Sequence, residues 1–405
     1  MSLVEKSRSG RTGRRAAFLA AATLLSVPCV AAADEVFKAT AGIAVPTWPA
    51  PPGKNISFDI SFVDPKIHTY VLGDRTSNAV DVVNTHDLTL TQIGKGLFTG
   101  ATSSNNTSGP DGVIIIHHSE VWAGDGNSTV KVLDINTGAL THTISTGGTM
   151  RADEECFDEV DNLLMVANNA DSPPFGTIIS ASTYTVKSKT TFTWSTNGAE
   201  QCSWSPRTGK FYITIPGVDS TGTQGEVDQI EPTTGAVLNR WPIDPTKCNT
   251  PQGSAVGPDH QIMIGCNDAS GATPTSGIII DDRDGSIIAT IPNESGPDEV
   301  YYNEGDGQYF LARSSASGSN ELLGVVDAVN PGNGDQSINL GLKGKGSAHS
   351  VAADSETRRV FVPIPNGLST CSQVGLSDTN GCIAVFTAKH DDKHDFIVRH
   401  NNNED

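Results

Sequence analysis

The chain has 405 residues and is acidic, with 27 Lys and Arg against 46 Asp and Glu and a formal net charge of -19. Nucleic acids and anionic membranes bind basic surfaces, so the composition argues against both as partners. Abundant glycine (41) and proline (22), few charges and no long amphipathic helical stretch predict an all-β protein.

The first 33 residues predict a cleaved export signal. An apolar stretch, residues 16–30, is too short to span a bilayer, and Ala31–Ala33 offers a small-residue cleavage site. The preceding basic region is made of Lys6, Arg8, Arg11, Arg14 and Arg15. Its Arg14-Arg15 pair leaves both the twin-arginine and the general secretory route open. We therefore expect a periplasmic or secreted protein with no membrane span.

Six of the seven cysteines remain after cleavage, because Cys29 leaves with the signal. An even number in an oxidising compartment predicts three disulfides. The spacing favours Cys248–Cys266 and Cys371–Cys382 as local loops, which leaves Cys156–Cys202. Other pairings are possible in principle, and this one rests on the repeat described next. A metal site is the alternative, but no C-x-x-C pair is present.

Residues 34–395 carry an internal repeat of about fifty residues. Each unit contains short apolar strands and a hairpin of alternating β-formers with turn residues at its tip. Six hairpins begin at Val80, Val130, Thr177, Val227, Ile278 and Gly324, and a seventh unit begins at Ser350. We predict a seven-bladed β-propeller of four-stranded antiparallel blades around a central channel. Two β-sandwiches would lack this strict period.

The ring must close in its last blade. The outer strand of that blade is expected either from Phe396–Arg399 or from the mature N-terminus at residues 36–45. Residues 396–405 are accordingly predicted to be a closing strand or a polar C-terminal tail. Closure by the N-terminal strand would remove an exposed sheet edge.

Three segments are similar to a known repeat: Tyr70-Val-Leu-Gly-Asp74, Leu164-Met-Val-Ala-Asn-Asn169 and Arg359-Val-Phe-Val-Pro363. They resemble the YVTN repeat of YncE-like exported β-propellers, and the resemblance covers nearly the whole mature chain. It implies a seven-bladed propeller. It leaves the function open, because that superfamily includes binding proteins, lyases and lactonases.

The candidate site is the start of the innermost strands, which line the channel of a propeller. Aligned on the strand ends, the repeat places six residues around one mouth: Asp59, Asp153, Glu200, Gln252, Asp298 and His349. In the second blade, which aligns poorly, Pro110-Asp111-Gly112 fills the slot. Glu154 and Glu299 stand one residue further along their strands. The alternative is that these polar groups bond to neighbouring strand backbones and hold the blades together.

Carboxylates gathered at one mouth repel one another, which raises their pKa values or favours a bound cation. We therefore predict a site for one divalent metal ion, with Ca²⁺, Mg²⁺, Zn²⁺, Mn²⁺ and Fe²⁺ not distinguished. Its expected ligands are Glu154, Glu200, Asp298, Glu299 and His349. His349 is also the candidate general acid or base, oriented by Glu200 or Glu299.

The loops between the second and third strands of each blade are expected on the same face. They supply further candidate ligand-binding residues, Asp74, Arg75, Asn168 and Arg313, beside Asp59, Asp153 and Gln252. The arginines suit an anionic group on a ligand. Polar loops without a binding role are the simpler account.

Two functions from different classes follow. The first is an exported propeller that binds a small polar ligand, a metal or an exported protein partner at the carboxylate- and histidine-lined mouth. The second is a metal-assisted enzyme, a lactonase-like hydrolase or a lyase, using the same rim. The sequence contains no G-x-S-x-G elbow, P-loop or dinucleotide fingerprint, which disfavours serine hydrolases and nucleotide enzymes.

Overall fold

The computed structural model describes residues 37–46, 48, 55–267, 276–292, 296–313, 322–332, 336–340 and 348–388. All of them belong to one compact unit, Asp34–Asp405. The predicted export signal (1–33) and the predicted closing strand or tail (396–405) lie outside these residues.

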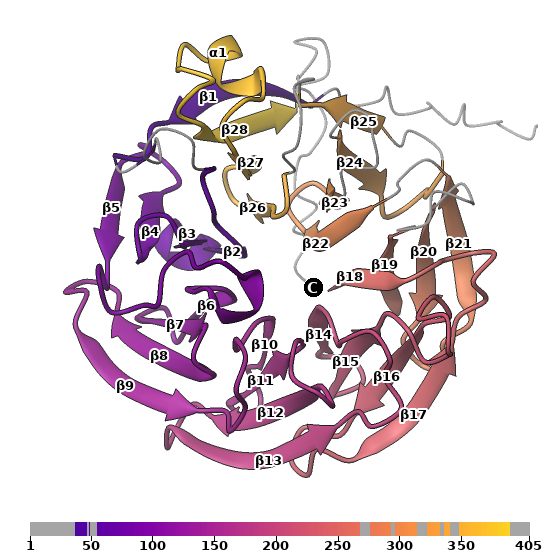
Figure 1. Cartoon of the computed structure of the whole chain (residues 1–405). Helices are drawn as coiled ribbons and strands as arrows, with labels where there is room; N and C mark the ends of the chain where they lie inside the picture. The colour runs from indigo at the N-terminus through magenta and orange to yellow at the C-terminus, as the bar shows by residue number, and fades with distance from the viewer. Residues whose placement is uncertain are drawn as a thin grey trace, which may run out of the picture. The chain divides into compact units, whose positions relative to one another are not determined.

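Within the described residues, twenty-eight strands form seven four-stranded sheets whose neighbouring strands run antiparallel. Figure 1 shows the sheets arranged as blades around a centre, and the innermost strands are β2, β6, β10, β14, β18, β22 and β26. The all-β, seven-bladed propeller prediction is therefore confirmed.

The first four blades follow one another along the chain, each running from its innermost to its outermost strand. Blade 1 contains β2 (Ser61–Asp64), β3 (Thr69–Asp74), β4 (Ala79–Asn84) and β5 (Leu90–Ile93), with the short 3-10 helix η1 (Pro65–Ile67) after β2. The 3-10 helix η2 (Asn105–Thr107) precedes blade 2, which contains β6 (Val113–Ile116), β7 (Glu120–Asp125), β8 (Thr129–Asp134) and β9 (Leu140–Ser145). Blade 3 contains β10 (Glu155–Asp158), β11 (Leu163–Asn168), β12 (Phe175–Ser180) and β13 (Thr185–Thr191). Blade 4 contains β14 (Cys202–Ser205), β15 (Lys210–Ile215), β16 (Glu226–Ile230) and β17 (Val237–Pro242).

Blades 5 and 6 keep the same order, and blade 7 is assembled from both ends of the propeller. Blade 5 contains β18 (Pro251–Val256), β19 (Gln261–Cys266), β20 (Ser276–Asp281) and β21 (Ile287–Pro292). Blade 6 contains β22 (Pro297–Asn303), β23 (Gln308–Arg313), β24 (Leu322–Asp327) and β25 (Gln336–Asn339). Blade 7 contains β26 (Ala352–Asp354), β27 (Arg359–Ile364) and β28 (Cys382–Ala388), with the short helix α1 (Thr370–Gln373) between β27 and β28 and β1 (Phe37–Ile43) outermost.

The ring closes through the N-terminal strand, one of the two predicted solutions. β1 pairs antiparallel with β28, from Phe37 opposite Ala388 to Ile43 opposite Ile383. The Phe37 ring also packs edge-on against Phe310 of blade 6, at 5.2 Å between centroids. The outer edge of β28 is thus covered, which protects it from pairing with another chain.

The core lies between the blades rather than at the centre of the ring. Trp122 and Val132 of blade 2 belong to one buried cluster with Leu164 and Val166 of blade 3. Alternation along each strand produces this arrangement, because successive side chains point to opposite faces of the sheet and each face meets a neighbouring blade. The blades thus bury their apolar side chains against one another around the channel.

The described residues contain three disulfides, and all three predicted pairings are confirmed: Cys156–Cys202, Cys248–Cys266 and Cys371–Cys382. Cys156–Cys202 links the innermost strands of blades 3 and 4, whose cysteines are 46 residues apart in the sequence. No helix among the described residues is long and apolar enough to cross a membrane.

The inter-blade disulfide is expected to stabilise the ring more than a local one. Replacing both Cys156 and Cys202 by Ser should lower the free energy of unfolding by roughly 2–4 kcal/mol, because the cross-link restricts the unfolded chain. The matched change of Cys371 and Cys382, which are 11 residues apart, closes a shorter loop and should cost less. Urea denaturation of both variants measures the difference, and the reverse ranking would contradict this account.

Candidate functional site

The structure brings the start of all seven innermost strands to one end of the channel. Each blade supplies one polar side chain within three residues of the start of its innermost strand, in the order Asp59, Asp111, Asp153, Glu200, Gln252, Asp298 and His349. Asp111, which precedes β6, occupies the position for which the sequence alignment suggested Pro110-Asp111-Gly112 in blade 2.

Two arginines, the buried Arg75 and the partly exposed Arg151, fill the space between the aspartates. Arg75, directly after β3 and 2% exposed, donates from Nε to Asp111 Oδ1 at 2.8 Å and also pairs with Asp59. Arg151, from the loop between blades 2 and 3, pairs with Asp153 at 2.7 Å and approaches Asp59 at 3.8 Å. Both cations therefore lie among the carboxylates of three neighbouring blades.

His349 closes the cluster from blade 7. Its Nε2 contacts Asp59, and its Nδ1 lies 2.7 Å from Asp298 Oδ2 of blade 6. Burial alone would lower the pKa of His349, but Asp298 and Asp59 raise it well above its usual value. His349 is consequently charged at neutral pH and bridges two blades. We call these seven residues the rim cluster: Asp59, Arg75, Asp111, Arg151, Asp153, Asp298 and His349.

Burial and charge divide the rim aspartates. Burial would raise the pKa of Asp59, yet Arg75 and His349 hold it well below its usual range. Burial raises the pKa of Asp111 well above its usual value despite Arg75, and it raises that of Asp153 to about 7 despite Arg151. The rim cluster therefore combines an ionised aspartate with others that retain protons more readily.

A second polar layer lies one residue deeper along the strands. Glu154 of blade 3 and Glu299 of blade 6 are 6% and 3% exposed and hydrogen-bond to each other. Gln201 of blade 4 reaches the same place, where its Nε2 donates to the Val300 carbonyl at 3.2 Å and its Oε1 accepts from Ser254 N at 2.6 Å. We call Glu154, Gln201 and Glu299 the carboxyl floor.

The carboxyl floor holds a proton at neutral pH. Burial and the neighbouring Glu299 raise the pKa of Glu154 well above its usual value. Burial also raises the pKa of Glu299 to about 8, although its hydrogen bond to Glu154 acts in the opposite direction. Two carboxyl groups in one low-dielectric site do not both ionise easily, so the pair retains protons at neutral pH.

A cavity of about 570 Å³ begins at this floor and runs along the channel away from the rim cluster. Glu154, Gln201 and Glu299 line it, whereas the rim cluster does not. Its far end is lined by exposed residues that follow the innermost strands: Lys66, His117, His118, Glu159 and Pro206. The cavity therefore opens at the face opposite the predicted mouth.

The walls of this cavity are mostly apolar and aromatic. Phe62, Phe157, Trp204 and Tyr301 contribute rings, and Ile60 and Val113 contribute aliphatic side chains. Glu155 also lines it, and burial raises the pKa of Glu155 to about 8. An apolar chamber with a few convergent polar groups is typical of a small-molecule site.

Glu200 faces a separate pocket of about 680 Å³ at the rim end, beside Asn169, Asp171 and Asn197. Burial and the charges of Asp298 and Asp153 raise the pKa of Glu200 to about 8. Gln252 is held by Asn267, which donates to its Oε1 at 2.6 Å.

The predicted loop residues lie at the same end but serve the fold. Asp74 accepts hydrogen bonds from Ser77 and from the Trp48 indole at 3.1 Å. Asn168 donates to Ser128 Oγ at 2.9 Å and to the Arg151 carbonyl at 3.1 Å. Arg313 ends β23, and its carbonyl accepts from His349 N. A ligand-binding role for these residues stays a prediction.

The expected metal ligands divide between the two layers, with His349 and Asp298 at the rim and Glu154 and Glu299 in the floor. Among the residues that the structure describes, three groups bring metal-ligating atoms within 4.8 Å of one another. They are Asp59–Asp111–Asp153, His260–Asp281–Asp282 and His68–His86–Glu356. None of these combines the five predicted ligands, and the metal site at the rim stays a prediction.

The sequence did not indicate Arg151 or Gln201 as site residues. Arg151 lies in an inter-blade loop outside the repeated strand pattern. Gln201 directly follows the rim residue Glu200, but the equivalent positions in blades 3 and 6 hold Glu154 and Glu299 rather than an amide. The only signal was position, because each lies within two residues of a predicted rim residue.

Comparison with known proteins supports the fold class alone. No family model and no curated protein matches the chain. A chain from the crystal structure of a mitotic checkpoint complex is similar, with a TM-score of 0.62 at 9% identity over 93% of this chain and 99% of that one. The WD40 domain of Neurospora crassa Pan2 has a TM-score of 0.59 at 11% identity over 89% and 97% of the two chains. The protein is thus a seven-bladed β-propeller.

Proposed function

We propose that this chain is an exported propeller of the YVTN-repeat kind that binds a small organic cation in its central cavity. The observation that supports this most directly is the carboxyl floor at the inner end of an aromatic-walled cavity of about 570 Å³. Three disulfides agree with an oxidising, periplasmic or extracellular location.

The acidic groups of the floor favour an amine over an anion or a neutral ligand. The Glu154–Glu299 pair retains protons at neutral pH, and a bound ammonium group would supply the positive charge needed to ionise its carboxyls. The Arg and His cations of the rim cluster are already paired with aspartates. Aromatic rings in the wall suit the apolar body of such a ligand and attract its charge.

Calorimetric titration with benzylamine, compared with benzyl alcohol, tests the proposal. The amine should bind more tightly and release protons, so its apparent enthalpy should vary with the ionisation enthalpy of the buffer. Glu299→Gln removes one carboxylate and should weaken amine binding by about tenfold or more. Glu231→Gln, on the outer surface, is the matched control. Equal affinity for amine and alcohol across a panel of alkyl and aryl amines would refute the cation site.

The fold also suits a protein partner, because propellers present wide faces covered by loops. The similar chain described above comes from the structure of a protein complex, the mitotic checkpoint complex. The cavity mouth supports the small-molecule function more directly, since it leads to buried ionisable groups.

A second candidate function is the predicted hydrolase or lyase. One observation favours it: Glu200 has a pKa raised to about 8 and faces a pocket at the rim, as a general acid would. Turnover of a lactone that disappears in Glu200→Gln while amine binding persists would support the enzymatic function. Amine binding that depends on Glu299, with no such turnover, would support the binding function.

A further inference from the structure

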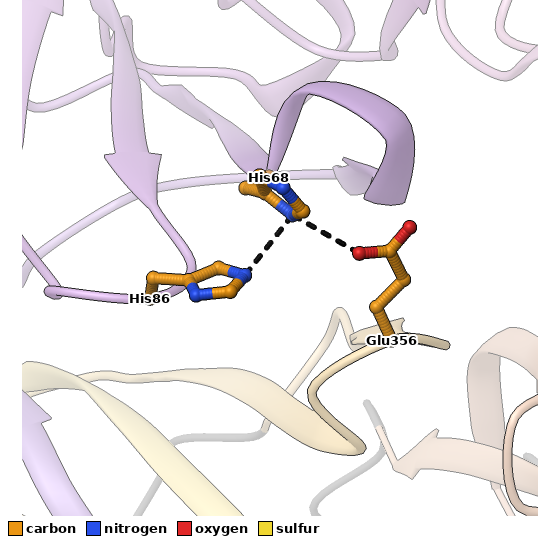
Figure 2. Close-up of side chains that lie close together, drawn as sticks. All are labelled: His68, His86 and Glu356. Carbon is orange, nitrogen blue, oxygen red and sulfur yellow. Dashed lines mark hydrogen bonds and ion pairs between the residues drawn. The ribbon is translucent and has the colours of Figure 1, made fainter.

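We propose a zinc site between blades 1 and 7, formed by His68, His86 and Glu356. Figure 2 shows the two imidazole rings and the carboxylate converging from three separate turns. His68 follows η1, His86 lies between β4 and β5, and Glu356 lies between β26 and β27. The site is distinct from the central cavity and from the predicted rim site.

The donor atoms already have the spacing of a metal site. His86 Nε2 lies 3.1 Å from His68 Nδ1, which lies 3.4 Å from Glu356 Oε2. Zinc bonds of about 2.0–2.2 Å place neighbouring donors of a tetrahedron roughly 3.3–3.5 Å apart. All three ligand atoms fall within 4.8 Å of one another. One ion fits between them with little movement.

The chemistry of the three donors favours zinc over calcium or magnesium. Two imidazole nitrogens and one carboxylate are borderline ligands, whereas calcium and magnesium prefer oxygen alone. A single atom, His68 Nδ1, faces both other donors and carries either one proton or one lone pair. A cation at the centre satisfies all three lone pairs together. The fourth position would be open to water.

The other two clusters with metal-ligating atoms already contain cations. In the rim cluster, Arg75 and Arg151 form ion pairs with the aspartates. In the other cluster, Arg207 pairs with Asp282 and Arg283 pairs with Asp281. At the proposed zinc site, Arg359 of β27 donates to the backbone carbonyls of Thr85 and His86 rather than to the ligand side chains. Arg359 thereby fixes the turn that carries His86, although its charge moderates the attraction for a cation.

The position gives the ion a structural role. The ring closes inside blade 7, where β1 pairs with β28, and the junction between blades 7 and 1 brings the C-terminal strand β26 against the N-terminal strand β2. A zinc ion held by His68 and His86 of blade 1 and Glu356 of blade 7 would cross-link this junction. Because zinc would bind the folded protein and not the unfolded chain, it would raise the thermal stability by mass action.

Zinc titration of the chelator-treated protein tests this proposal. We expect one high-affinity Zn²⁺ per chain and a higher melting temperature with zinc than with Ca²⁺. Co²⁺ in its place should give the visible absorption of a tetrahedral site. Loss of a group that only hydrogen-bonds to a metal ligand weakens metal binding by roughly 10- to 100-fold. His86→Gln and Glu356→Gln each remove a ligand itself and should weaken zinc binding by more than that.

His260→Gln is the matched control, because it removes a histidine from the second cluster and should leave zinc affinity unchanged. His86 and Glu356 are exposed, so their replacement is expected to leave the fold intact, which circular dichroism checks. Absence of zinc binding, unchanged affinity in both ligand variants, or loss of affinity in His260→Gln would each overturn the site. None of these outcomes bears on amine binding in the cavity.

Discussion

Replacing Arg75 by Met is expected to lower the free energy of unfolding by roughly 3–5 kcal/mol, the cost typical of removing one partner from a buried ion pair. Arg75 is 2% exposed and is the shared partner of Asp59 and Asp111, which are equally buried. Without it, Asp111 loses its cation in a site that cannot hydrate a carboxylate, and Asp59 keeps only His349 and the more distant Arg151. Urea denaturation at pH 7 measures the loss.

Lys210→Met provides the matched comparison. Lys210 pairs with Glu231 at 3.0 Å, and the two side chains are 26% and 27% exposed. An ion pair whose partners are both reached by solvent contributes about 0–1 kcal/mol, so this change should be small. Similar losses in the two variants would show that burial does not govern the Arg75 pair.

Adding Asp111→Asn to Arg75→Met should recover part of the lost stability, because it removes the carboxyl that the first change leaves without a cation. The recovery is a coupling free energy, which a double-mutant cycle isolates. Acidification should act in the same direction on the single variant, since protonation discharges the stranded Asp111 carboxyl. A double variant less stable than Arg75→Met alone would exclude charge as the cause.

The sequence predicts the fold and the disulfides because both follow from a regular repeat. The period sets seven blades, and the equivalent places of Cys156 and Cys202 in adjacent units make their pairing reasonable. The repeat also identifies the residues at the start of the innermost strands. These predictions depend only on positions within a unit, which sequence periodicity reports directly.

Pairing across the channel is not periodic, which is why the site was predicted only in part. Whether a carboxylate is free or neutralised depends on side chains from other blades, such as Arg151 against Asp59. The Glu154–Glu299 contact joins blades 3 and 6, whose residues are far apart in the sequence. The same holds for His68 and Glu356, which meet only because the ring closes.

The structure also shows that the rim residues and the open cavity lie in different places, although the sequence predicted one site at the mouth. The rim residues were predicted as one mouth able to receive a ligand, but their charges largely neutralise one another. The open volume begins one layer deeper and leads to the opposite face. A residue pattern places groups along a strand, whereas the direction in which a cavity opens depends on how all seven strands pack.

Buried carboxyls with raised pKa values should give the protein its greatest stability in mildly acidic solution. Burial raises the pKa of Asp153 to about 7 and those of Glu155, Glu200 and Glu299 to about 8. Their unfolded values are about 4, so the folded state holds protons that the unfolded state releases. This stability is complete below about pH 4 and is lost as the pH rises through 7 to 8. Asp59, whose pKa is lowered, acts oppositely and loses its contribution in acid.

Glu155→Gln isolates one of these groups. Its carboxyl oxygens are buried and, among the described residues, have no hydrogen-bond partner, so ionisation above pH 8 is costly in the folded state. The variant should gain stability relative to the wild type between pH 5 and pH 9 by on the order of 2 kcal/mol, less than full burial implies because the residue is half-buried. Denaturation curves at both pH values measure this change. For the surface variant Glu231→Gln, the stability difference from the wild type should be nearly the same at pH 5 and pH 9. If Glu155→Gln also showed no change with pH, the Glu155 carboxyl would have the same pKa in the folded and unfolded states.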